Sequence, residues 1–189
     1  MLWRLVKQVY ALWQVRQDPV AYATSLGVSI GEGSAVFSNE LSIFGGHPFL
    51  VTLGKRCFIT EGVRFVTHDG GVLLFRRDMP DLDLVAPIVL GDDVYVGMRS
   101  IILPGTRVGN RCVIGAGSVV RGDVPGESVV AGVPARVIKP LSEYQAGLLA
   151  HGLSCGRMNP SAKEAFLKHH FCLRGGREAQ NQTGGKSGF

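Results

Sequence analysis

From Leu90 to Pro125 the sequence repeats every six residues, and this repeat constrains the backbone more than any other feature of the chain. The first place of each unit is aliphatic, the second is usually Gly, and the fifth is small or β-branched. The first-place residues are Leu90, Val96, Ile102, Val108, Ile114 and Val120, and the fifth-place residues are Val94, Ser100, Thr106, Cys112, Ser118 and Val124. One large apolar residue in every six does not match the stripe of an amphipathic α-helix.

The repeat predicts an all-β solenoid, namely a left-handed parallel β-helix in which three hexapeptides form one triangular coil. Each short strand is expected to turn its aliphatic residue inward. The Gly and small places are expected at the corners, where positive φ or close packing excludes larger side chains. Ile30 and Val36 are in the same phase, as are Leu53, Ile59 and Phe65, so the coil begins near residue 30.

The period is lost between Gly70 and Pro87, a stretch that is charged and contains two prolines. The wall of a solenoid cannot absorb such a segment, so residues 70–87 are predicted to form an extruded loop. The period resumes at Ile88.

Helical segments are expected on both sides of the β-helix domain, which covers residues 28–140. Residues 1–27 form a predicted N-terminal helical cap, and residues 141–189 hold C-terminal helices, at about 141–150 and 160–171, and a flexible tail. The first helix combines Trp with Arg and Lys, so a helix that lies on a membrane surface is an alternative to the cap.

The charge distribution argues against nucleic-acid binding. The chain carries a net charge of +5, yet residues 31–140 contain eleven basic and eleven acidic side chains. A nucleic-acid protein more often has a basic stripe on its folded body, so the surplus in the flanks is interpreted as solvated charge.

The four cysteines show no spacing typical of a metal site, so no metal is predicted. Cys57 and Cys112 occupy fifth places and are expected to be packed core residues. Free thiols favour a cytoplasmic location. Arg4 and Lys7 interrupt the apolar stretch that a signal peptide requires, and no run is long enough to span a membrane.

His68 stands immediately before the extruded loop, in the string Thr-His-Asp-Gly-Gly at residues 67–71. An imidazole suits general-base catalysis because it titrates near neutral pH. An ordinary surface histidine is the alternative, but a long loop that leaves a rigid wall is a typical place for a binding pocket.

This string, together with Gly-Ala-Gly-Ser at 115–118 and Ala-Gly-Val-Pro-Ala-Arg-Val-Ile-Lys at 131–139, resembles the hexapeptide-repeat acyltransferases that use acetyl-coenzyme A. The resemblance covers about residues 28–140. It is closest to the sugar and polysaccharide O-acetyltransferases and to the xenobiotic acetyltransferases that modify antibiotics.

The resemblance implies a homotrimer with an active site in each cleft between neighbouring coils. The catalytic histidine of the family falls on His68, which takes the proton from the acceptor. A backbone N–H, at Gly97 or Met98, is implied to stabilise the tetrahedral oxyanion. No covalent enzyme intermediate is required.

The resemblance also implies a path for acetyl-coenzyme A. Small residues allow the pantetheine arm to approach the coil, basic residues meet the phosphates, and an aromatic residue stands where many relatives carry Trp. The residues concerned are Gly115, Ala116, Gly117, Ser118, Arg136, Lys139, Arg121 and Tyr95. As an alternative to coenzyme binding, residues 115–118 are ordinary corner residues, and Arg136 and Lys139 are a solvated basic pair. Arg121 is expected on the same side of the coil as Arg136 and Lys139.

No motif in the sequence identifies the acceptor. Asn39 lies near the place of an acceptor-binding Asn in relatives, Asp69 either orients His68 or starts the turn, and Arg76 hints at an acidic acceptor. The predicted function is transfer of an acetyl group to a hydroxyl of a sugar or polysaccharide precursor.

The alternatives to this function are antibiotic acetylation, amino-sugar acetylation, a zinc carbonic anhydrase and a non-catalytic scaffold. The zinc enzyme needs three convergent histidines, whereas only His47 and His68 lie in the coil.

Overall fold

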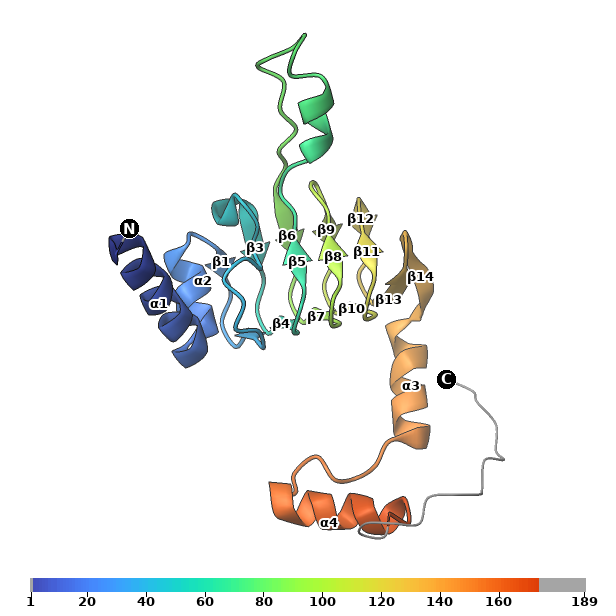
Figure 1. Cartoon of the computed structure of the whole chain (residues 1–189). Helices are drawn as coiled ribbons and strands as arrows, with labels where there is room; N and C mark the ends of the chain where they lie inside the picture. The colour runs from blue at the N-terminus through green and yellow to red at the C-terminus, as the bar shows by residue number, and fades with distance from the viewer. Residues whose placement is uncertain (1, 174–189) are drawn as a thin grey trace. The chain divides into compact units, whose positions relative to one another are not determined.

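The computed structural model describes residues 2–173, without the side chains of residues 2, 4 and 8, and the predicted flexible tail, residues 175–189, lies outside this range. The chain divides into two compact units between residues 146 and 147. The first unit contains a coil of short strands that stack into three sheets (Figure 1).

The strands of each sheet come from successive turns of the coil. Sheet A contains β1 (Ser29–Ile30), β3 (Val51–Leu53), β6 (Ile88–Leu90), β9 (Arg107–Val108) and β12 (Asp123–Val124). Sheet B contains β2 (Ala35–Val36), β4 (Phe58–Ile59), β7 (Tyr95–Val96), β10 (Val113–Ile114), β13 (Ser128–Gly132) and β14 (Ala135–Pro140). Sheet C contains β5 (Arg64–Phe65), β8 (Ile101–Ile102) and β11 (Val119–Val120).

The chain visits sheets A, B and C in turn, so the sheets are the three sides of a parallel β-helix. We call its corners AB, BC and CA, after the sheets that the connecting segment joins. All the strand pairs are parallel except β13 with β14, an antiparallel hairpin that ends the coil. The predicted parallel β-helix is therefore confirmed.

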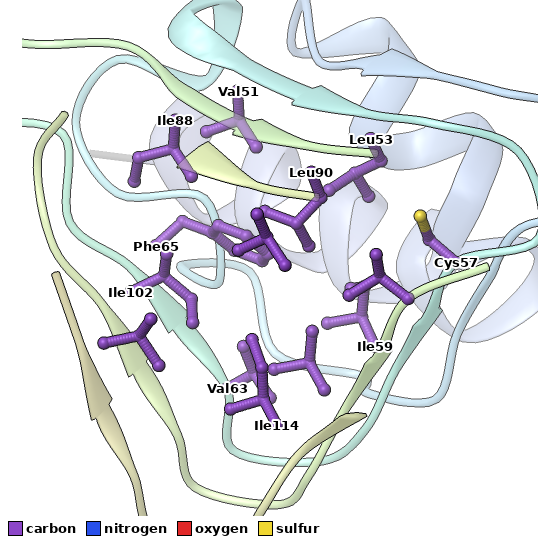
Figure 2. Packing of buried hydrophobic residues seen from close by; sticks show 14 of the residues in the cluster. Val51, Leu53, Cys57, Ile59, Val63, Phe65, Ile88, Leu90, Ile102 and Ile114 are labelled. Carbon is purple, nitrogen blue, oxygen red and sulfur yellow. The ribbon is translucent and has the colours of Figure 1, made fainter. Parts of the chain in front are cut away.

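The six-residue period is the period at which side chains enter the core. All six first-place residues are buried, and so are all six fifth-place residues. Inward residues stack in register from coil to coil, as Leu53 does on Leu90 and Leu90 on Val108. Figure 2 shows the labelled side chains pointing into the interior that the ribbon encloses. Full burial of each aliphatic side chain contributes about 1.5–3 kcal/mol.

The glycines at second places are needed for close packing and not for their φ angles. A Cβ on Gly97 would lie 2.5 Å from the Ala116 nitrogen of the next coil, and one on Gly109 would lie 2.5 Å from the Gly126 nitrogen. Positive φ occurs instead at fourth places, where Asp93 and Arg99 both have φ of 58°. Of the two reasons predicted for these glycines, close packing is therefore observed, and positive φ is not found at the second places.

The repeat also shifts by two residues near its end. Val124, predicted at a fifth place, lies in β12 and pairs with Val108, so it occupies a first-place position. Gly122, with φ of 71°, lies in the shortened CA corner that makes this shift possible.

The helices form at the segments that the sequence predicts. In the first unit, α1 (Leu2–Gln17) packs on α2 (Pro19–Ser25), and α2 contacts β1 and β2. The Asp18 carboxylate caps α2 by accepting from the Ala21 N–H at 2.9 Å. Farther along the chain lie α3 (Leu141–His151) and α4 (Pro160–His170), and among residues 2–173 no helix could cross a membrane.

Thiol labelling tests the burial of the cysteines. Cys57, Cys112 and Cys155 are buried and Cys172 is exposed, and burial raises the pKa of the Cys57 thiol. Only the thiolate reacts with Ellman's reagent, so we expect one rapidly labelled thiol in the native protein and the others only after denaturation. Rapid labelling of Cys57 or Cys112, located by peptide mass spectrometry, would contradict the packing of the coil.

Candidate functional site

A long segment leaves the coil at the CA corner between β5 and β6 and forms the green arm in Figure 1. It contains the 3₁₀ turn η2 (Gly70–Leu74). Two backbone hydrogen bonds close its foot, from Asp69 N to Leu84 O at 2.9 Å and from Ala86 N to Thr67 O at 3.0 Å. Between them His68 forms an isolated antiparallel bridge with Val85, so the two sides of the foot hold the backbone of His68 in place.

The His68 side chain is exposed, and a second histidine lies beside it. The rings of His47 and His68 meet edge to face with centroids 5.6 Å apart. His47 Nδ1 lies 3.3 Å from the Thr67 hydroxyl, within hydrogen-bond distance. A Cβ on residue 46 would lie 3.6 Å from His68 Cε1, so Gly46 also lies next to the His68 ring. The CA corner therefore presents a histidine pair beside the foot of the arm.

His47 was missed as a partner of His68 by sequence reasoning, which weighed it only as a zinc ligand. The signal was the spacing from Val36 to Leu53, which is one residue short of three repeats. That spacing places the segment around the 3₁₀ turn η1 (Pro48–Leu50) at the CA corner, one coil before β6. Among residues 2–173 no group of three potential metal ligands occurs.

Asp69 and Arg76 lie on the arm with His68. The Asp69 carboxylate accepts a hydrogen bond from Gly71 N at 2.8 Å and caps η2. Of the two roles predicted for Asp69, the structure therefore shows the one in which it starts the turn. Arg76 pairs with Asp83 at 3.3 Å across the arm, where both side chains are exposed. Asn39 is exposed and lies at the BC corner, away from these residues in the coil order.

The two candidate oxyanion donors lie at the BC corner, directly after β7. The Gly97 N–H donates to Ile114 O at 2.8 Å and is therefore part of the ladder between coils. The Met98 carbonyl accepts from Gly117 N at 2.8 Å, whereas no described residue accepts from the Met98 N–H. Of the two alternatives, only Met98 has a backbone donor without a partner in the described part of the chain.

The small residues at 115–118 occupy the same corner one coil farther on. The Ser118 hydroxyl is buried, donates to Gly115 O at 2.6 Å and accepts from Gly132 N at 3.2 Å, so it is committed to the corner. Ala116 and Gly117 are exposed, and a Cβ on Gly117 would meet nothing within 4 Å. The surface at this point is open to a ligand.

The basic candidates do not all lie together. Arg136 is opposite Ala131 in the β13–β14 hairpin, and Ala131 packs next to Gly115 of the BC corner. Lys139 lies farther along β14 and pairs with Glu143 at 3.1 Å. Arg121 follows β11 at the CA corner, so the expectation that it shares a side with this pair is not met. Tyr95 is exposed on β7 in sheet B.

The candidate residues thus form two half-sites within one chain. The CA corner carries the histidine pair, the arm and Arg121, whereas the BC corner carries Met98, residues 115–118 and, close by, Arg136. Sheet C separates the two corners. The predicted proton acceptor and the predicted coenzyme surface therefore lie on different corners of one chain.

The comparisons with known proteins agree with this architecture. The family described as "Bacterial transferase hexapeptide (six repeats)" matches residues 87–122. Protein CapG of Staphylococcus aureus is 40% identical over 146 residues, which cover 77% of this chain and 85% of that protein. The putative lipopolysaccharide biosynthesis O-acetyl transferase WbbJ of Escherichia coli is 38% identical over 97 residues, 47% of this chain and only half of its own length.

Among solved structures, galactoside acetyltransferase in complex with coenzyme A matches with a TM-score of 0.50. It is 20% identical, and the match covers 75% of this chain and 82% of that one, which supports the fold alone. The family match and the extent of the CapG alignment together show to which family the chain belongs. It belongs to the hexapeptide-repeat acyltransferases and is an enzyme of that family.

Proposed function

We propose that this enzyme transfers an acetyl group from acetyl-coenzyme A to a hydroxyl group of a sugar or polysaccharide precursor. The observation that carries the proposal is His68, an exposed imidazole on a backbone fixed at the foot of the arm. The name of WbbJ, which specifies O-acetyl transfer, supports the reaction class, and membership of the hexapeptide-repeat acyltransferases supports the donor. The free cysteines favour a reaction in the cytoplasm.

A homotrimer of left-handed coils would complete the site. Three-fold symmetry can bring the CA corner of one chain against the BC corner of its neighbour. The same contact then occurs at all three interfaces. The separation of the two half-sites by sheet C supports this arrangement, because neither corner alone holds both a base and a coenzyme surface.

The chemistry follows from the groups at the two corners. His68 takes the proton from the acceptor hydroxyl while its oxygen attacks the thioester carbonyl. The Met98 N–H of the neighbouring chain donates to the resulting oxyanion. Collapse of the tetrahedral intermediate expels the thiolate of coenzyme A, which takes up the proton from the His68 imidazolium. Because both substrates lie in one cleft, proximity supplies much of the rate.

For the coenzyme, the open surface at Ala116 and Gly117 suits a narrow pantetheine arm. Arg136 lies beside this corner, and within residues 2–173 it makes only a local hydrogen bond to Ala135 O, so we expect its guanidinium to be available to a phosphate. Lys139 would have to exchange Glu143 for phosphate, which costs little because the pair is partly exposed.

The test is release of free coenzyme A from acetyl-coenzyme A in the presence of nucleotide sugars, monosaccharides, serine and antibiotics, one at a time. We expect release with a saccharide hydroxyl and a rise of the melting temperature with the coenzyme alone. Release with an amine or an antibiotic would move the acceptor class to the alternative function. If the assays show no release of coenzyme A and no thermal shift, the non-catalytic scaffold is the remaining interpretation.

His47 provides a prediction of smaller effect. We propose that it positions the His68 ring, so His47→Ala should lower kcat about tenfold, because a slightly misplaced base loses its alignment. The KM for acetyl-coenzyme A should stay unchanged, because His47 contacts His68 and Thr67 and not the residues assigned to the coenzyme. Steady-state kinetics against His169→Ala, a change on α4, decide the point. An unchanged kcat, or a changed KM alone, would remove His47 from this role.

A further inference from the structure

Helix α1 turns an apolar side away from the rest of the first compact unit. Among the side chains of α1 that the structure describes, the buried Val15 and the half-buried Ala11 and Gln14 lie toward the protein. Its exposed apolar residues, which we call the α1 apolar face, are Trp3, Leu5, Val6, Val9, Tyr10, Leu12 and Trp13. A helix on the surface of a globular protein normally has the opposite orientation. Some other phase or molecule must therefore cover this face.

The α1 apolar face is large and contiguous. Five of its residues line an open hollow of about 440 Å³, and they are Leu5, Val6, Val9, Tyr10 and Trp13. The indoles of Trp3 and Trp13 are 68% and 57% exposed. Contiguous apolar surface of this kind marks an interaction site, whereas scattered single residues would not.

The charge of the helix selects among possible occupants. Residues 2–17 contain three basic residues and no acidic one. Lys7 Nζ lies 5.1 Å from the centroid of the Trp3 ring, so a cation stands at the rim of the apolar face. Two copies of this helix packed face to face would bring like charges together. An anionic membrane surface accommodates both the apolar side chains and the cations.

We propose that α1 lies in the headgroup region of an anionic membrane, with the α1 apolar face inserted and Lys7 near the lipid phosphates. Tryptophan and tyrosine suit this depth, because each ring has an apolar body and a polar tip. The proposal concerns where the enzyme is held and does not depend on the acetyl-transfer reaction.

The chain offers a specific reporter, because its only two tryptophans both lie on α1. The full-length protein is mixed with vesicles of phosphatidylcholine alone or with about a third of phosphatidylglycerol, and both tryptophan emission and co-sedimentation are followed. We expect a blue shift and pelleting with the anionic vesicles, weakened by high salt because the lipid charges are screened. No binding to anionic vesicles, or equal binding to both kinds, would overturn the proposal.

A matched pair of variants assigns the binding to α1. Val9→Glu places a charge in the middle of the α1 apolar face, and Gln145→Glu makes the same change of charge on exposed α3. Val9→Glu should reduce partitioning about tenfold or more while Gln145→Glu leaves it unchanged. Equal binding by both variants would contradict the role of α1. A blue shift that grows with protein concentration without vesicles, and disappears in Val9→Glu, would assign the face to a second copy instead.

Discussion

His68→Ala is expected to lower turnover about 10³-fold while leaving acetyl-coenzyme A binding unchanged. Removing a general base costs on the order of 10²–10⁴ in rate, because the acceptor hydroxyl is a poor nucleophile until its proton is taken. The coenzyme is assigned to residues 115–118 and Arg136, whereas the His68 imidazole is assigned to the acceptor hydroxyl, so coenzyme affinity should not depend on this imidazole. Coenzyme release gives the rate, and calorimetric titration gives the dissociation constant.

The control for this variant is His169→Ala, which removes a histidine from exposed α4. It should retain full activity. The side chain of His68 is itself exposed, so its removal should not change the melting temperature. If His68→Ala keeps more than about a tenth of the wild-type rate, His68 is not the base. Loss of coenzyme binding together with turnover would instead place His68 in the coenzyme site.

Gly109→Ala should destabilise the fold by about 3 kcal/mol or more. The added Cβ would lie 2.5 Å from the nitrogen and 2.7 Å from the Cα of Gly126 in the next coil. These are backbone atoms, so they can yield only if the stack of coils opens. At a fixed protein concentration the melting temperature should fall by roughly 10 °C.

Gly147→Ala is the matched control, because it adds the same methyl group in α3 with nothing within 4 Å. Alanine is the better helix former by about 1 kcal/mol, so this change should be neutral or slightly stabilising. Equal melting temperatures for the two variants would mean that the coils are not packed as closely as described.

The inward positions of the coil were predictable because each depends on one local property, an apolar residue at a fixed period. Leu90 and Val96 could therefore be assigned to the core without knowing their neighbours. The same holds for α2, whose start is encoded by Asp18 and the proline that follows it. His68 was located because it stands where the period stops.

What could not be predicted depends on contacts between coils. The packing of Gly109 on Gly126 joins residues seventeen positions apart and is visible only once the coils are stacked. Arg121 lies at the CA corner because it directly follows β11 of sheet C, and that corner is known only once the strands are assigned to the three sheets. His47 meets His68 because two segments with no period of their own share one corner.

The separation of the half-sites allows one decisive measurement, in which two inactive variants are expressed together. His68→Ala lacks the base at the CA corner, and Ala116→Trp blocks the open surface at the BC corner. If each site uses the CA corner of one chain and the BC corner of its neighbour, a random mixture of equal amounts restores about a quarter of the wild-type activity, since that share of sites receives two intact halves. No activity in the mixed assembly would contradict a site shared between chains.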